Sequence, residues 1–193
     1  DYPCFQYGEE GYPGVNDQVY YKEGIYVGYR HFDTRKVKPQ FPFGFGLSYT
    51  TFKYGKATIS EVTCDKEGDA SCKEKSEGCC KAKSESCCKA KAPLYKVSIP
   101  VSNVGKREGK EIVQLYIGDD KCSVDRPVKE LKGFQKIALA PGETKTVDFC
   151  ITLKDLQFFD EATHAWKAEP GKFKAYIGAS ELDIRAIVPF TLK

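Results

Sequence analysis

The sequence contains no methionine, only two histidines, and no Asn-X-Ser/Thr acceptor for N-glycosylation among its 193 residues. Without methionine, Asp1 cannot be a translation start, so we expect the chain to be a processed product or part of a longer protein whose remainder lies upstream. His31 and His164 are far apart, and neither has other ligand types clustered around it. A histidine-based metal site or catalytic base is therefore not expected.

The chain also lacks a long apolar run and a strong charge of either sign. No apolar stretch approaches the roughly 20 residues that a membrane-spanning helix needs. The 30 Lys and Arg residues against 27 Asp and Glu residues give a net charge of +3. This balance indicates a mixed, solvated surface and not a nucleic-acid-binding one. We therefore expect neither a membrane nor a nucleic acid as a partner.

What the sequence does contain is a series of short strand patterns. Its 12 tyrosines and 12 phenylalanines favour strands. Alternating apolar runs are separated by Gly, Pro and Asp turns every ten residues or so, which is typical of an antiparallel sandwich. The pattern predicts strands over residues 56–62, 94–103, 110–118, 128–138, 144–153, 172–179 and 185–192. It also predicts a helical turn at 153–159 and a short strand and turn at 165–171, with Trp166 in the core or at a sheet edge.

The same alternation predicts which side chains form the core. In the strand at 110–118, one face carries Val113, Leu115 and Ile117, while Gln114 and Tyr116 lie on the other. The strand at 94–103 is expected to bury Tyr95, Val97, Ile99 and Val101. The apolar face of each strand is thus the expected core face.

Consecutive motifs in this part of the chain carry a resemblance to a known family. Residues 109–117 read Gly-Lys-Glu-Ile-Val-Gln-Leu-Tyr-Ile, residues 126–134 read Arg-Pro-Val-Lys-Glu-Leu-Lys-Gly-Phe, and residues 139–144 read Leu-Ala-Pro-Gly-Glu-Thr. In this order they resemble the fibronectin type III-like domain that closes glycoside hydrolase family 3 enzymes. Residues 21–60, with Phe-Pro-Phe-Gly-Phe-Gly-Leu-Ser-Tyr-Thr at 41–50, resemble the segment that leads into this domain in β-glucosidases.

The resemblance implies an all-β fold, a seven-stranded immunoglobulin/fibronectin type III-like sandwich over residues 52–193. An extended docking arm at residues 1–51 would lead into it from an upstream α/β domain. In this family the nucleophilic Asp and the acid/base Glu, the carboxylate pair that retaining hydrolysis needs, precede the motifs found here. The resemblance therefore assigns no catalytic residue to this chain, which we expect to be inert alone.

The expected function is that of the C-terminal accessory domain of a secreted β-glucosidase, an enzyme that hydrolyses terminal β-D-glucosyl residues. Its expected partners are the upstream catalytic domains, and no cofactor is expected. A second hypothesis is a non-catalytic extracellular binding or structural module. A polysaccharide, or another chain joined by an intermolecular disulfide, is a further candidate partner.

The arm carries closely spaced aromatic residues, and residues 19–29 are expected to run extended. Such rings are costly to leave in water, because each buried ring is worth about 1.5–3 kcal/mol. In the resembled family this segment lies against the α/β domain, so Tyr20, Tyr26, Tyr29 and Phe32 are candidate interdomain contacts. The alternative is that these rings pack on the sandwich itself, and the sequence does not decide between the two.

A cysteine-rich insertion, residues 64–92, separates the first two expected strands. Residues 60–91 form four copies of an eight-residue repeat and carry too few apolar residues to build a core. The candidate disulfide cysteines are Cys64, Cys72, Cys79, Cys80, Cys87 and Cys88. Disulfides suit a secreted protein, but a thiolate cluster for zinc or copper and a largely unstructured tract also remain open. The absence of Cys-X-X-Cys weighs against zinc.

Three cysteines outside the insertion, Cys4, Cys122 and Cys150, bring the total to nine. Because this number is odd, one thiol is expected to be unbridged or bonded to another chain. The acidic residues of the loop at 119–126 lack the spacing of a calcium loop, so we expect an ion pair within this loop. Arg126 and Glu130 are expected to form a structural pair.

Overall fold

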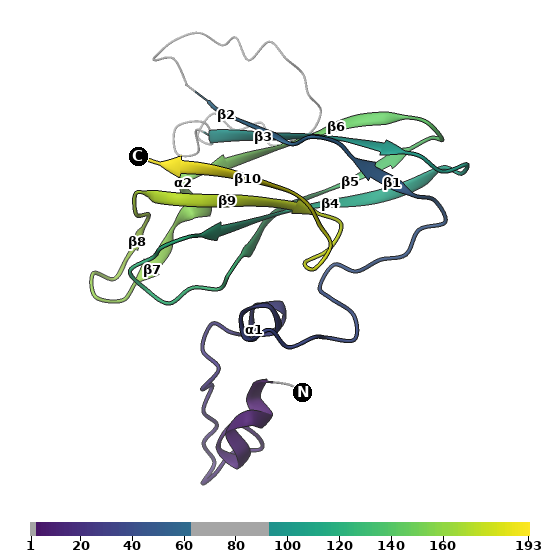
Figure 1. Cartoon of the computed structure of the whole chain (residues 1–193). Helices are drawn as coiled ribbons and strands as arrows, with labels where there is room; N and C mark the ends of the chain where they lie inside the picture. Colours follow the sequence, from purple (N-terminus) through teal and green to yellow (C-terminus); the bar gives the residue numbers. More distant parts are fainter. Residues whose placement is uncertain (1–2, 63–92) are drawn as a thin grey trace, which may run out of the picture.

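The computed structural model of the chain describes residues 3–62 and 93–193 (Figure 1). Most described residues after position 51 belong to strands, which confirms the all-β class. Two four-stranded antiparallel sheets pack face to face, and a two-stranded hairpin lies at one end of them. The core lies between the two sheets, as in other β-sandwiches.

The first sheet is organised around β3. Its strands are β1 (Phe52–Tyr54), β2 (Thr58–Glu61), β3 (Pro93–Asn103) and β6 (Thr144–Thr152). β1 and β2 pair one after the other with the same edge of β3, and β6 pairs with the opposite edge. The predicted core residues of β3, which are Tyr95, Val97, Ile99 and Val101, are at most 7% exposed.

The second sheet has β4 near its centre. Its order is β10 (Ile184–Leu192), β9 (Gly171–Gly178), β4 (Gly109–Asp119) and β5 (Glu130–Leu139). On β4, Val113, Leu115 and Ile117 belong to the core, as predicted. Gln114 and Tyr116, on the opposite face, are also buried, at 4% and 0% exposure. Alternation separates the two faces of a strand but does not say what covers each, and here the N-terminal arm covers the second face.

The predicted sandwich of seven strands has eight in the described part of the chain, four in each sheet. Every predicted strand has a counterpart, and the additional sandwich strand is β1, whose three residues are too few for alternation to predict it. The hairpin consists of β7 (Phe158–Asp160), which was not predicted as a strand, and β8 (Ala165–Lys167), the counterpart of the short strand expected at 165–171. Trp166 on β8 is 64% exposed, so it lies at the edge of this two-stranded sheet and not in the core.

The helical turn predicted at 153–159 is present over its first part as α2 (Leu153–Leu156), whereas Phe158 and Phe159 belong to β7. The backbone N–H and the hydroxyl of Thr152 both donate to the carboxylate of Asp155, at 2.8 and 2.6 Å. These bonds occupy polar groups that would otherwise be unsatisfied at the start of the helix. Leu156, only 1% exposed, fixes the turn to the core.

The arm is not the extended segment that the sequence predicted. It contains a 3-10 helix, η1 (Pro3–Glu10), and the helix α1 (Tyr29–Arg35). Residues 19–28 contain turns and no strand. Figure 1 shows α1 below the sheet of β4 and β5, with η1 farther from the sandwich. None of the helices among the described residues is long and apolar enough to cross a membrane.

The candidate disulfide cysteines of the insertion lie outside the described residues. The described residues on either side are close together, because the Val62 N–H donates to the Leu94 carbonyl at 2.9 Å. Cys122 and Cys150 are both half-buried and are not bridged to each other. The disulfide and metal hypotheses for the insertion stay predictions.

Candidate docking surface

Helix α1 is positioned by unusual backbone conformations at both ends. Gly28, immediately before it, has a φ of 61°, a left-handed conformation that glycine adopts without strain. Lys36, immediately after it, is also left-handed, and its N–H donates to the Asp33 carbonyl at 3.3 Å. These conformations turn the chain sharply before and after the helix. The seven residues of α1 therefore form a short, defined element against the sandwich.

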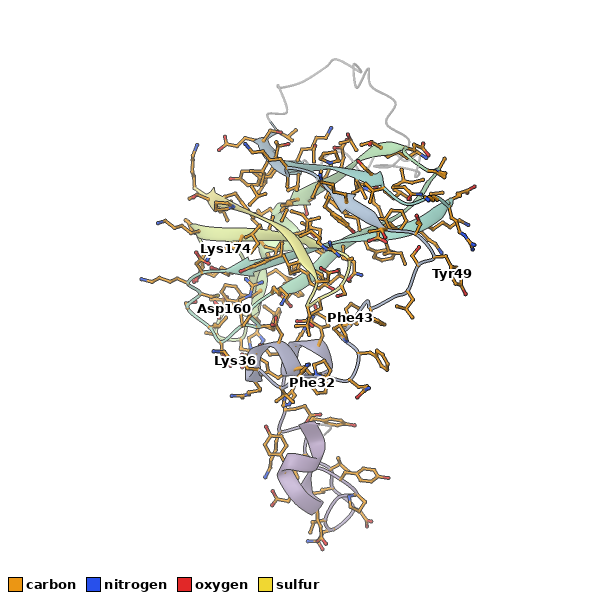
Figure 2. The ribbon with its side chains drawn as sticks, turned by 45° about the vertical axis from the view of Figure 1, so that its right-hand side comes forward. Phe32, Lys36, Phe43, Tyr49, Asp160 and Lys174 are labelled. Atoms are coloured by element: carbon orange, nitrogen blue, oxygen red, sulfur yellow. The ribbon has the colours of Figure 1, made fainter. Side chains whose placement is uncertain are left out.

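Aromatic rings join α1 to the outer face of β4. The ring of Tyr29 stacks on Phe43 with centroids 4.8 Å apart and meets Tyr116 edge-on at 5.9 Å. The Leu131 N–H donates to the Tyr29 hydroxyl at 2.9 Å. Figure 2 shows Phe43 between the arm and the sandwich. The arm therefore covers part of the sheet with specific contacts.

Gln114 fixes the segment around Phe43 to the same face. Its Nε2 donates to the carbonyls of Gly44 and Ala179, at 3.2 and 2.8 Å, and its Oε1 accepts from the Tyr116 hydroxyl at 2.5 Å. Gly44 has a φ of 78°, and a Cβ there would lie 2.4 Å from the Gln114 amide. Only glycine allows this close approach. Burial raises the pKa of Tyr116, which keeps its hydroxyl a donor.

A buried group of charges links α1 to two loops of the sandwich. The Lys129 ammonium lies 2.6 Å from the Asp33 carboxylate of α1 and 3.1 Å from the Glu181 carboxylate between β9 and β10. The side chains of Lys129 and Glu181 are 7% and 1% exposed. Burial raises the pKa of Glu181, and the Lys129 ammonium opposes this shift. Because these charges are buried away from water, removing one of them leaves the others without compensation and destabilises the fold.

A second cluster of charges surrounds Glu130. Arg126 donates to its carboxylate at 3.0 Å, which confirms the predicted pair, and Arg30 and Lys132 each approach it at 3.3 Å. Burial alone would raise the pKa of Glu130, but these cations together lower it. Arg126 also lies 3.6 Å from Asp119, which confirms the ion pair expected in this loop. The loop between β4 and β5 is thus fixed beside the arm.

The candidate interdomain contacts lie in different environments. Tyr29 contacts the sandwich as described above. Tyr26 is 8% exposed, and burial together with a hydrogen bond to Asp125 raises its pKa to about 12. Phe32 is half-buried and lines a cavity of about 180 Å³ with Phe43, whereas Tyr20 is 48% exposed. The structure therefore brings Tyr26 and Tyr29 to the sandwich, and the role of all four in interdomain contacts stays a prediction.

The rest of the arm presents an apolar surface to solvent. Between residues 7 and 49, fourteen large apolar side chains are at least 36% exposed, and Leu47 and Tyr49 reach 90% and 94%. Figure 2 shows Tyr49 at the periphery of the molecule. We call this set the arm face, and it consists of Tyr7, Tyr12, Val15, Val19, Tyr20, Tyr21, Ile25, Val27, Val37, Phe41, Phe43, Phe45, Leu47 and Tyr49. An arm that exposes this many large apolar side chains is a candidate interaction surface.

Two buried oxygens in the arm have no partner among the described residues. They are Oε2 of Glu23 and Oγ1 of Thr34. A buried polar atom without a hydrogen bond is costly, so native structures rarely contain one. Both atoms lie in the arm, on either side of the start of α1.

Sequence reasoning missed the buried charges, because no pattern marks them. Lys129 lies within the recognised motif at 126–134, but its partners are 96 and 52 residues away. Of the two histidines, His31 lies on α1 and His164 lies in the turn between β7 and β8. Within residues 3–62 and 93–193, no three His, Cys, Asp or Glu side chains are grouped so that they could hold a metal ion.

A hydrogen-bonded carboxylate ties the loop after β4 to the turn before β9. The Ser123 hydroxyl and N–H donate to Glu169 at 2.7 and 3.0 Å, and Lys167 lies 3.1 Å from it. These bonds, those from Ser123 first, lower the pKa of Glu169 to about 2. Since the folded pKa is below the unfolded one, the stabilisation is complete above about pH 4.5 and is lost as the pH falls toward 2.

We expect Ser123→Ala to raise the pKa of Glu169 toward its ordinary value, because the substitution removes the strongest of these bonds. Side-chain carboxyl chemical shifts followed by NMR between pH 1.5 and 6 measure this pKa. Ser102→Ala, which removes an exposed hydroxyl bonded to Thr144, is the matched control and should leave Glu169 unchanged. An unchanged Glu169 titration in Ser123→Ala would contradict the assignment.

Comparison with known proteins shows what this chain is similar to. The family described as the fibronectin type III-like domain matches residues 111–181. The β-glucosidase BoGH3A of Bacteroides ovatus is 50% identical over 190 residues, which cover 98% of this chain and 22% of that protein. The thermostable β-glucosidase B of Acetivibrio thermocellus is 44% identical over 173 residues, which cover 90% of this chain and 20% of that protein.

A solved structure shows the same fold. The β-glucosidase of glycoside hydrolase family 3 from Bifidobacterium adolescentis matches with a TM-score of 0.79 and 29% identity, over 100% of this chain and 24% of that one. The chain thus spans about a fifth of the length of the curated relatives it matches. The resemblance stated from the motifs is confirmed: the chain contains a fibronectin type III-like domain and is homologous to β-glucosidases of glycoside hydrolase family 3.

Proposed function

We propose that this chain is the C-terminal accessory region of a secreted family 3 β-glucosidase. In this proposal, residues 1–51 dock on the catalytic domains and residues 52–193 form the supporting sandwich. The whole protein hydrolyses terminal β-D-glucosyl residues with catalytic carboxylates that lie outside this chain. Secretion is part of the proposal because nine cysteines in 193 residues are typical of an oxidising compartment.

The arm face is the observation that carries the proposal. It exposes large apolar side chains next to buried oxygens that have no partner among the described residues. The matched relatives are about five times longer than this chain, so they contain ample polypeptide to cover such a surface. Protein interfaces are enriched in aromatic residues, and eight of the fourteen side chains of the arm face are Tyr or Phe.

The proposal predicts no activity for this chain and activity for a chimera. We expect the purified chain to release no p-nitrophenol from p-nitrophenyl β-D-glucoside above a heat-inactivated control. In the chimera, this chain replaces the 190 matching residues of the Bacteroides ovatus relative. We expect it to keep kcat/KM within about tenfold of that enzyme, because chemistry supplied elsewhere needs only a correct support.

Deletion of the same residues from the relative is the reference for this experiment. We expect the deletion variant to lose activity or to unfold at a lower temperature. Turnover by the isolated chain would place catalysis on it and contradict the proposal. A deletion variant as active and as stable as the intact enzyme would show that the region supports nothing.

A non-catalytic binding module is the second candidate, and one observation favours it. An open groove between the sandwich and the arm is lined by exposed aromatic rings and by charged side chains of both signs. This groove can be tested on the chain itself.

A further inference from the structure

An open groove lies between the β7–β8 hairpin, the loop after β4 and the arm. Its volume is about 700 Å³, within the range of about 300–1,000 Å³ typical of small-molecule sites. Phe159 and Trp166 line it from the hairpin, Ile25 from the arm, and Arg126 from the loop. Three separate parts of the chain thus form one concave surface.

Two aromatic rings on the hairpin are held together and remain open to solvent. Phe159 and Trp166 are cross-strand partners in the β7–β8 pairing. Their rings meet edge-to-face, with centroids 5.7 Å apart, an arrangement that favours a fixed geometry. Yet they are 46% and 64% exposed. Rigid, exposed aromatic rings in a groove offer a flat apolar surface on which a ligand can stack.

The polar lining of the groove has almost no net charge. Its charged members are Arg30, Asp125, Arg126, Glu130, Lys132, Asp160 and Glu161. Three are basic and four are acidic, so the groove has no strong field to attract a phosphate or another highly charged ligand. Figure 2 shows Asp160 on the lower edge of the sandwich.

This composition also differs from that of a protein interface. Interface centres are depleted of Asp, Glu and Lys, and five of the lining residues are of these types. A ligand that suits the groove is uncharged, has an apolar face for the rings, and carries many hydroxyl groups for the charged side chains.

We propose that this groove binds a short uncharged oligosaccharide, with a sugar ring stacked on Trp166 and Phe159 and its hydroxyls bonded to side chains of the lining. Pyranose rings combine an apolar C–H face with hydroxyls around the edge, and this is the combination that the groove presents. The site is argued from its own composition. Only the choice of β-linked glucose as the first probe rests on the proposed function.

Trp166 is the only tryptophan of the chain, so its fluorescence reports directly on the groove. The test titrates the chain with cellotetraose and, separately, with maltotetraose, whose glucose units are α-linked. We expect a saturable change in emission and protection of Trp166 from iodide quenching with at least one of the two. Binding of either supports the site, and a difference between them identifies the preferred linkage.

Phe159→Ala removes one ring and leaves the reporter in place. We expect it to weaken binding about two- to tenfold, the effect of losing one aromatic contact. The matched control is Phe134→Ala, which removes a ring that is 66% exposed on β5 and outside the groove, and which should leave affinity unchanged. Glu161→Gln keeps both rings and should also weaken binding. This second variant tests the site if Phe159→Ala misfolds.

Two outcomes would overturn the proposal. The first is a flat titration with both sugars up to millimolar concentration. The second is an equal loss of affinity in Phe159→Ala and Phe134→Ala. Neither of these outcomes affects the activity test of the chimera itself, so the two proposals fail separately.

Discussion

Replacing Lys129 with methionine will lower the free energy of unfolding by about 3–5 kcal/mol, the usual effect of removing one partner from a buried ion pair. The substitution keeps the length of the side chain but removes its ammonium group. Asp33 and Glu181 then face each other without the cation that separates them. Glu181 is 1% exposed, so water cannot replace the lost partner.

Urea unfolding followed by circular dichroism measures this loss. Because Asp33 belongs to α1, we also expect limited proteolysis to cleave the arm of Lys129→Met faster than that of the unchanged chain. The matched control is Lys145→Met. Its side chain is 48% exposed beside Glu143, and such surface pairs are worth about 1 kcal/mol or less.

A second substitution that restores part of the stability would show that the unpaired Glu181 carboxylate causes the loss. Adding Glu181→Gln to Lys129→Met removes the buried charge that was left unpaired, so part of the stability should return. Two results would show that these charges are solvated and that the arm is held in another way. One is a loss for Lys129→Met no larger than that of the Lys145 control, and the other is no recovery in the double variant.

Replacing Tyr116 with alanine is the second change expected to have a large effect. Tyr116 is completely buried between β4 and the arm, where its ring meets Tyr29. Truncating a buried aromatic ring to alanine costs about 3–5 kcal/mol, because apolar burial is lost and a cavity remains. The cavity would lie under the arm, so thermal unfolding and arm proteolysis should both change.

Tyr116→Phe keeps the ring and removes only the hydroxyl, so it measures the contribution of the hydroxyl to stability. It leaves the Oε1 of Gln114 without its donor and should cost about 1–3 kcal/mol. Tyr49→Ala removes a ring that is 94% exposed and should change stability by about 0.5 kcal/mol or less in the isolated chain. If Tyr116→Ala were as mild as Tyr49→Ala, the contact between the arm and β4 would not stabilise the chain.

The sequence predicts the parts of the fold that depend on local alternation. β3 and β4 are recognisable because apolar residues recur at every second position and turn residues bound them. The residues predicted for the core of each strand are buried. The ordered motifs carried the family resemblance, because they extend over several strands and their turns.

The parts that the sequence did not predict depend on distant contacts. The second buried face of β4 exists because Tyr29 and Phe43, more than 70 positions away, cover it. Such long-range packing overrides what alternation alone predicts. Trp166 was expected in the core or at a sheet edge, and it lies at the edge of the two-stranded hairpin with its ring 64% exposed. Residues 19–29 were expected to run extended because they carry closely spaced aromatic residues, but this part of the arm contains turns and leads into α1.

The hydrogen bond between Val62 and Leu94 has a consequence for engineering. Since β2 and β3 are already joined as adjacent strands at that point, the fold needs only a short connection there. Loop length has a weak effect on closure entropy, so the position is a natural attachment point. A purification tag, a fluorescent reporter or a foreign binding module could be spliced into it while the sandwich stays intact.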